Sequence, residues 1–410
     1  MSVDYIVLAI PVFFLLIGLE LLIARLLERD YYRLADSLAD LSCGMAQQLL
    51  EVLVKTLLFA GYLYVFSRFR LLELDGASPV VWAGCFLGVD FLYYWFHRLS
   101  HEVNAFWAAH VVHHQSEEYN LAVALRQGAL QGWFSWAFYL PLALLGFPPL
   151  VFLGASSFNT LYQFWIHTRV IGRLGPLEWV LNTPSNHRVH HGRNPKYVDR
   201  NHGGTLIVWD RLFGTYQAEE EEVVYGITTP LRSWNPLWAN LHYWVELWGK
   251  ARRIARVSDR LRLFLRPPGW QPAELGGFVP APAVDAARYR KWETPLPRGV
   301  WPYALAQFAL LLGATLFLLL RQDALDRRVF AGVAAALVAG LAVLSGVLER
   351  RPWALALEAA RHAALAAAAL AGAAFLPAGW TLAAAGLGAL SLAWLVALRG
   401  RLAGPAPEVS

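Results

Sequence analysis

Eight histidines of this 410-residue chain fall into three short motifs whose spacing suits metal binding. The motifs are HxxxH at His97 and His101, and HxxHH at His110, His113 and His114 and again at His187, His190 and His191. On an α-helix, side chains three or four residues apart lie on one face, so each motif is expected to point its imidazoles at a common position. Imidazole is a ligand for iron, zinc and copper, and the motifs therefore predict a metal site.

The number of these imidazoles predicts two metal ions. A mononuclear site uses about three or four protein ligands, and the three motifs offer eight, while His167 stands alone in the sequence. The identity of the metal stays open at this point. No Glu-x-x-His motif of the carboxylate-rich di-iron bundles occurs in the chain, and an all-imidazole site suits zinc as well as iron.

Asp90 is an acidic residue within an apolar run, about two helical turns before His97. An ionisable side chain is costly in such a run and usually faces the protein interior. We expect its carboxylate to accept the N–H of a ligating imidazole, an arrangement that orients metal ligands. A role in helix packing is the alternative.

The apolar segments that would position these motifs are long enough to cross a bilayer. The chain is 57% hydrophobic and only 16% charged, whereas soluble domains carry about 25% charged residues. Seven runs approach the roughly 20 apolar residues that a membrane span needs. They lie near Tyr5–Ala24, Leu41–Phe66, Val80–Phe96, Trp301–Leu320, Val329–Val347, Trp353–Leu376 and Trp380–Leu398. Two shorter runs, Leu130–Leu145 and Pro148–Trp165, are expected to form a helical hairpin. The predicted fold is an all-α polytopic membrane bundle.

The distribution of arginines predicts the orientation of this bundle. Arg25, Arg29 and Arg33 follow the first run, and by the positive-inside rule the loop that carries them is cytoplasmic. Counting crossings from there puts the histidine motifs at the cytoplasmic face. The loop from Arg321 to Arg328 opposes the rule. The arginine-rich stretch Arg252–Arg266 is interleaved with apolar residues, which favours a helix on anionic lipid over nucleic-acid binding.

The same runs divide the chain into four predicted parts. Residues 1–79 are N-terminal transmembrane helices, 80–275 a catalytic domain, 276–299 a linker and 300–400 C-terminal transmembrane helices. His362 is the only histidine of the last part.

Cys43 and Cys85 form neither a disulfide framework nor a CxxC metal motif.

Longer motifs around the histidines resemble the fatty acid hydroxylase and sterol desaturase superfamily and, within it, the alkylglycerol monooxygenase family. The resemblance covers roughly residues 80 to 275, and the C-terminal helices are also similar to that family's layout. Four segments carry it: DFLYYWFHRLSHE from Asp90, HHQSEEYNLAVALRQ from His113, QFWIHT from Gln163 and NHGGTLIVWDRLFGTY from Asn201.

The resemblance implies two iron ions held by the eight motif histidines, with His167 as a further ligand. It also implies that Glu102, directly after His101, is a catalytic residue, because it matches a glutamate of the alkylglycerol monooxygenase motif. The chain departs from the pattern at two positions. Gln163 stands where relatives can offer a histidine, and His202 stands where the superfamily usually has tyrosine.

The expected function is that of a membrane-bound di-iron monooxygenase, which uses O₂ to hydroxylate a C–H bond of a membrane lipid and cleaves an ether lipid. The electrons must come from an external reductase or reductant, because no flavin, haem or dinucleotide motif occurs in the chain. The family likeness implies tetrahydrobiopterin as one such reductant. The alternatives are a sterol desaturase or a fatty-acyl or sphingolipid hydroxylase of the same superfamily, a membrane zinc hydrolase, and a non-catalytic metal carrier.

Overall fold

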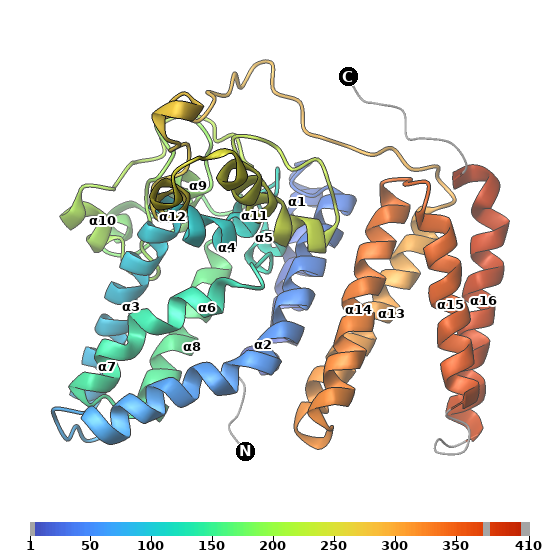
Figure 1. Cartoon of the computed structure of the whole chain (residues 1–410), viewed down its shortest axis with the longest axis horizontal. Helices are drawn as coiled ribbons and strands as arrows, with labels where there is room; N and C mark the ends of the chain where they lie inside the picture. The colour runs from blue at the N-terminus through green and yellow to red at the C-terminus, as the bar shows by residue number, and fades with distance from the viewer. Residues whose placement is uncertain (1–4, 372–377, 403–410) are drawn as a thin grey trace. The chain divides into compact units, whose positions relative to one another are not determined.

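The computed structural model describes residues 5–371 and 378–402, and helices are the only extended regular elements in these ranges (Figure 1). The all-helical prediction is confirmed. Residues 372–376, the end of one expected span, lie outside the described residues. The α-helices are α1 (Tyr5–Leu26), α2 (Leu34–Phe69), α3 (Pro79–Glu102), α4 (Asn104–His114), α5 (Leu121–Ala124), α6 (Gln131–Ser135), α7 (Leu140–Leu145), α8 (Pro149–Trp165), α9 (Pro184–His190), α10 (Val208–Phe213), α11 (Pro236–Arg253), α12 (Val257–Leu265), α13 (Trp301–Leu320), α14 (Arg327–Leu348), α15 (Ala354–Ala371) and α16 (Ala378–Leu402).

Seven of the described helices are long and apolar enough to cross a membrane: α1, α2, α3 and α13 to α16. These match the seven long runs expected from the sequence, and the chain is an integral multi-pass membrane protein. The expected hairpin is formed by shorter pieces. Its first half consists of α6, the 3₁₀ turn Trp136–Tyr139 and α7, and its second half is the 17-residue α8.

The chain forms two compact units. The first contains the residues up to Leu231 together with Ala239–Arg290, and the second contains Arg232–Trp238 and the residues from Lys291 onward. The division into four parts expected from the sequence stays a prediction.

The apolar core of the first unit lies between α2, α3, α7 and α8. Tyr62 of α2 stacks on Phe152 of α8 with ring centroids 4.3 Å apart, and its hydroxyl donates to the carbonyl of Phe147 at 3.0 Å. The turn between α7 and α8 requires glycine. Gly146 has a φ of 99°, and a Cβ there would lie 2.1 Å from the carbonyl oxygen of Leu72. This packing fixes α3 and α8, which both lead into the histidine-bearing end of the unit.

Helices α4, α5, α9, α11 and α12 gather at the end of α3 (Figure 1). Helix α4 begins at Asn104, directly after α3 ends, and side chains of α11 and α12 such as Leu247 and Leu263 bury its Ala108. The Asn104 side-chain amide donates to the carbonyl of Leu263 at 2.8 Å and accepts from the Tyr243 hydroxyl at 2.6 Å. Helix α4, which carries the second histidine motif, is therefore held on two sides.

The described part of the second unit consists mainly of helices α13 to α16. Its apolar core joins the start of α13 to the ends of α14 and α16 through Val300, Val347, Leu395 and Leu398. Helices α15 and α16 run side by side (Figure 1). This unit carries none of the eight motif histidines.

Candidate metal centre

The nine candidate histidines lie in two groups, and all nine are buried. Within each group, one nitrogen from every ring lies within 4.8 Å of those of the others. The five-histidine site consists of His97, His101, His110, His114 and His190, and the four-histidine site of His113, His167, His187 and His191. The two sites adjoin, because the rings of His114 and His191 stack with centroids 4.5 Å apart.

Each HxxHH motif divides its histidines between the two sites, so the expectation that a motif points all its imidazoles at one position is wrong. His110 and His114 belong to the five-histidine site, whereas His113 belongs to the four-histidine site. Likewise His187 and His191 share one site and His190 lies in the other. Residues i and i+4 differ by only about 40° around a helix, but neighbours differ by about 100°. The i, i+4 pairs therefore stay together and the residue between them turns to the other site.

The ring nitrogens within each site face one another at short distances. In the five-histidine site, the Nε2 atoms of His97 and His114 lie 3.1 and 3.2 Å from Nε2 of His110. In the four-histidine site, the Nε2 atoms of His113 and His187 lie 3.2 and 3.1 Å from Nε2 of His167. Metal–imidazole bonds of about 2.1 Å put ligand nitrogens about 3.0 Å apart at right angles and about 3.4 Å apart in a tetrahedron. The observed separations fall in this range.

Hydrogen bonds on the far side of the rings fix which nitrogen faces inward. Five Nδ1 atoms each lie within 2.9 Å of an oxygen that can only accept, so Nδ1 carries the proton and Nε2 presents its lone pair to the site. The pairs are His97 with the carbonyl of His202, His110 with Oε1 of Gln131, His113 with the carbonyl of Arg126, His167 with the carbonyl of Gln163, and His190 with the carbonyl of Arg200. Such partners orient metal-bound histidines in other proteins.

Burial keeps the four imidazoles of the four-histidine site neutral, together with those of His110, His114 and His190. It lowers the pKa of His110 to about 3 and that of His167 to about 4, and neighbouring histidines lower the pKa values of His187 and His190 further. Neutral rings whose lone pairs face one another cannot hydrogen-bond, and the Nε2 atoms of His101, His190 and His191 have no partner among the described residues. A cation between the rings would satisfy them all, so the donor set fits a metal ion in each site.

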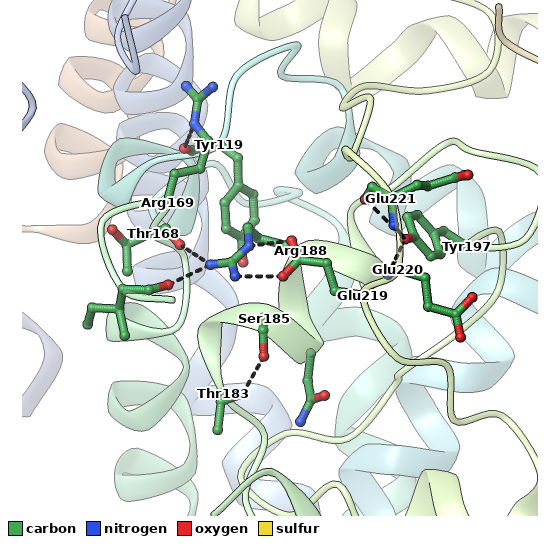
Figure 2. A network of polar contacts seen from close by, with 12 residues as sticks. Tyr119, Thr168, Arg169, Thr183, Ser185, Arg188, Tyr197, Glu219, Glu220 and Glu221 are labelled. Atoms are coloured by element: carbon green, nitrogen blue, oxygen red, sulfur yellow. Dashed lines mark hydrogen bonds and ion pairs between the residues drawn. The ribbon is translucent and has the colours of Figure 1, made fainter. Parts of the chain in front are cut away.

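Helix α9, which carries the third motif, has only seven residues and is held by Arg188 (Figure 2). The guanidinium of Arg188 donates to both carboxylate oxygens of Glu219 at 2.7 Å and to the carbonyls of Thr168 and Ile171 at 3.0 and 2.7 Å. Arg188 lies next to His187 in the chain, so one side chain ties the third motif to the segment that follows His167.

Asp90 is buried and accepts four hydrogen bonds, none of them from a histidine. Its carboxylate accepts from the backbone N–H groups of Thr205 and Leu206 and from the side chains of Asn159 and Trp209, at 2.6 to 3.1 Å. The expected bond to a ligating imidazole is therefore absent from these contacts. The reason is the position of the loop after α9, because its backbone N–H groups at Thr205 and Leu206 occupy the carboxylate of Asp90. The predicted role of Asp90 in supporting the metal ligands stays a prediction.

Glu102 lies outside both histidine sites. Its carboxylate accepts from Nε of Arg98 at 2.8 Å, one helical turn earlier, and its side chain is 39% exposed. Because Glu102 lies about 100° around the helix from His101, it points away from the site that His101 faces. Its catalytic role stays a prediction that no observed contact supports.

Three residues that the sequence reasoning missed support the sites. The side-chain oxygen of Gln131 accepts a hydrogen bond from Nδ1 of His110, the carboxylate of Asp199 lies 3.4 Å from Nδ1 of His101, and the ring of Tyr119 stacks on His167. A polar residue inside an apolar run is a signal that could have identified Gln131. No local pattern marks Asp199 or Tyr119, because their partners are distant in the sequence.

Comparisons with known proteins agree with this site. A family model described as fatty acid hydroxylase matches residues 82–215, which contain all nine histidines of the two sites. The chain is 44% identical to alkylglycerol monooxygenase of Xenopus tropicalis over 310 residues, covering 75% of this chain and 69% of that protein. The Homo sapiens and Danio rerio proteins of that name are 43% and 40% identical, covering 75% and 86% of this chain and 70% and 79% of theirs. No solved structure matches the chain.

Proposed function

Because this chain belongs to the alkylglycerol monooxygenase family and is a membrane lipid monooxygenase, we propose that its two histidine sites hold two iron ions and that its substrate is an ether lipid. The observation that supports this most directly is the convergence of nine buried imidazoles on two adjoining sites. The names of the relatives suggest the substrate. Hydroxylation at the carbon beside the ether oxygen gives a hemiacetal, which breaks down to an aldehyde and a glycerol product.

When bound, the iron pair supplies the activation of O₂, one atom of which enters the lipid while the other leaves as water after two electrons and two protons are added. The protein's own part is to hold nine imidazoles in place and to keep the Nε2 lone pair of five of them inward. The Nδ1 anchors do this, because a ring whose Nδ1–H is bonded to a carbonyl cannot turn to present that nitrogen instead.

The side chains around the sites also exclude water. Tyr119 stacks on His167 and on Tyr225, with ring centroids 5.6 and 5.0 Å apart, and its hydroxyl donates to the carbonyl of Ile166. Tyr119 and His167 are both buried. A water-poor site strengthens electrostatic interactions and keeps reactive oxygen species from being lost to solvent.

The proposal includes an external electron donor and an orientation. Tetrahydrobiopterin, which the family likeness implies, is the proposed reductant, with another external donor or reductase as the alternative. The sites are proposed to lie at the cytoplasmic face, because Arg25 and Arg29 follow the first apolar helix.

The test is metal and product analysis of protein purified without oxygen. We expect two irons per chain and, with an O-alkylglycerol, a reductant and ¹⁸O₂, a fatty aldehyde that carries ¹⁸O when it is trapped by reduction. His113→Ala should lose iron and the product. His242→Ala is the matched control, because His242 is half-buried on α11 and belongs to neither site.

Three outcomes would contradict the proposal. Full activity with zinc in place of iron would exclude iron chemistry. A product without ¹⁸O would point to hydrolysis, and a new carbon–carbon double bond would point to a desaturase.

A further inference from the structure

His202 is a tenth histidine at the metal centre, and it lies beside the five-histidine site. Its side chain is 0% exposed. The centroid of its ring lies 5.1 Å from that of His101, 5.6 Å from that of His190 and 5.7 Å from that of His97. It is not one of the five converging histidines, but it borders three of them.

The ring nitrogens of His202 share the signature of the site histidines. Neither Nδ1 nor Nε2 makes a hydrogen bond of ordinary geometry. Burial lowers the pKa of His202, and the nearby backbone of Asp199 raises it by a smaller amount. A buried polar atom normally has a partner. Among the described residues of the first unit, the other histidines with an unpartnered buried nitrogen are His101, His187, His190 and His191. All four belong to the two sites.

The backbone holds His202 in place. The carboxylate of Asp210 accepts hydrogen bonds from the backbone N–H groups of His202 and Gly203 at 2.7 Å each, and the carbonyl of His202 accepts a hydrogen bond from Nδ1 of His97. Asn201, the residue before it, adopts a φ of 57°, in the left-handed region. These contacts fix the backbone position from which the ring of His202 extends beside the five-histidine site.

We propose that His202 is a sixth imidazole ligand of the metal in the five-histidine site. With His202 this site would offer six imidazoles and would leave a bound metal no room for a further ligand, whereas the four imidazoles of the other site would leave room for O₂. A catalytic metal needs an open position and a closed one does not react directly. The inference rests on the proposed function.

The experiment replaces His202 with phenylalanine, which keeps a packing ring and removes both nitrogens, and loads the metal-free full-length protein with Co(II). Visible absorption of Co(II) is weak with six ligands and several-fold stronger with five or four. We expect His202→Phe to bind two cobalt ions, to strengthen the absorption of one of them, and to release that ion to a chelator about tenfold faster or more.

A second variant covers the case in which the first does not fold. His202→Ala should show the same spectral change, and added imidazole should reverse it by occupying the vacated position. His242→Phe is the matched control for the loss of a half-buried histidine outside both sites, and its cobalt spectrum and release rate should equal those of the original protein.

Two outcomes overturn the proposal in distinguishable ways. If the original protein binds two cobalt ions and His202→Phe leaves both the spectrum and the release rate unchanged, His202 is a packing ring and the proposed function stands. If the original protein binds no metal at all, the proposed function fails together with this inference.

Discussion

Both units of this protein bury histidine and other polar side chains, but they satisfy them in opposite ways. In the first unit, neutral imidazoles face one another, and several inward nitrogens have no partner. In the second unit, the Tyr303 hydroxyl donates to Glu358 at 2.7 Å, and Arg361 donates to both oxygens of that carboxylate at 2.7 and 2.9 Å. Facing acceptors fit a cation that is not part of the chain, whereas donors that face acceptors satisfy one another within the chain.

The second unit therefore illustrates what a structural polar cluster looks like in the same protein. Nε2 of His362 lies 2.8 Å from the Tyr303 hydroxyl, and Gln307 accepts from Arg361 at 2.8 Å. Only Nδ1 of His362 is left without a partner among the described atoms of this cluster. The cluster ties α13 to α15, and we expect it to contribute to the packing of these helices and not to the reaction.

The largest expected effect separates the two regions by activity. His187→Ala removes an imidazole from the four-histidine site, and loss of the metal held there should lower the rate by roughly a thousandfold, since metal ions contribute several kcal/mol to such reactions. Iron content should fall from two toward one per chain. His362→Ala in the second unit should retain both irons. Loss of iron in this variant would contradict the conclusion that the cluster around His362 is structural.

The second effect is on stability alone. Glu358→Ala leaves the half-buried Arg361 without its carboxylate, and breaking such a pair costs up to about 3–5 kcal/mol, the range for fully buried pairs. Thermal unfolding in detergent should show this loss, while the activity per folded molecule stays unchanged. The double variant Glu358→Gln with Arg361→Met should recover most of the stability. A variant that is equally stable but inactive would place this cluster in the reaction.

The third effect depends on pH and concerns the metal-free protein. Burial lowers the pKa of His110 and His167 from 6.5 to about 3 and about 4. Below pH 6.5 the unfolded chain binds protons that the folded chain does not, so stability is complete above pH 6.5 and falls as the pH decreases toward 4. At pH 5 the loss is roughly 2 kcal/mol for each histidine. Urea unfolding at pH 7.5, 6 and 5 measures it.

The control for this effect is the variant that combines His110→Phe and His167→Phe, whose stability should depend less steeply on pH over the same range. An unchanged slope would mean that these two rings are protonated in the folded metal-free protein.

The smallest effect tests the anchors of the rings. Gln131→Leu removes the oxygen that accepts from Nδ1 of His110, and loss of such a partner weakens metal binding by about 10- to 100-fold. Iron retention against a graded chelator measures this change. Gln271→Leu is the matched control, because Gln271 donates to the carbonyl of Leu275 and contacts neither site. Equal retention by both variants would show that the tautomer of His110 does not depend on Gln131.

Sequence reasoning located the membrane helices because apolar composition over about 20 residues is a local property. It also pointed to eight of the nine histidines of the two sites, because ligand type and i, i+4 spacing are local as well. His167 and the family came from the resemblance of longer motifs. Sequence reasoning did not predict the bonding of Asp90, whose partners at Thr205 and Leu206 are more than a hundred residues away. It also did not predict that the first half of the hairpin divides into α6 and α7, because these short helices lie within one continuous apolar run.

The sequence by itself thus determined which side chains are available and which pairs share a helix face. Only the tertiary structure decided how the three motifs divide into two sites, since this depends on where α4 and α9 lie relative to α3 and to His167. The tertiary structure also decided the tautomers, because the carbonyl that orients His97 belongs to His202, 105 residues later in the chain. Helix periodicity acts over one or two turns, whereas hydrogen-bond partners are set by the packing of distant segments.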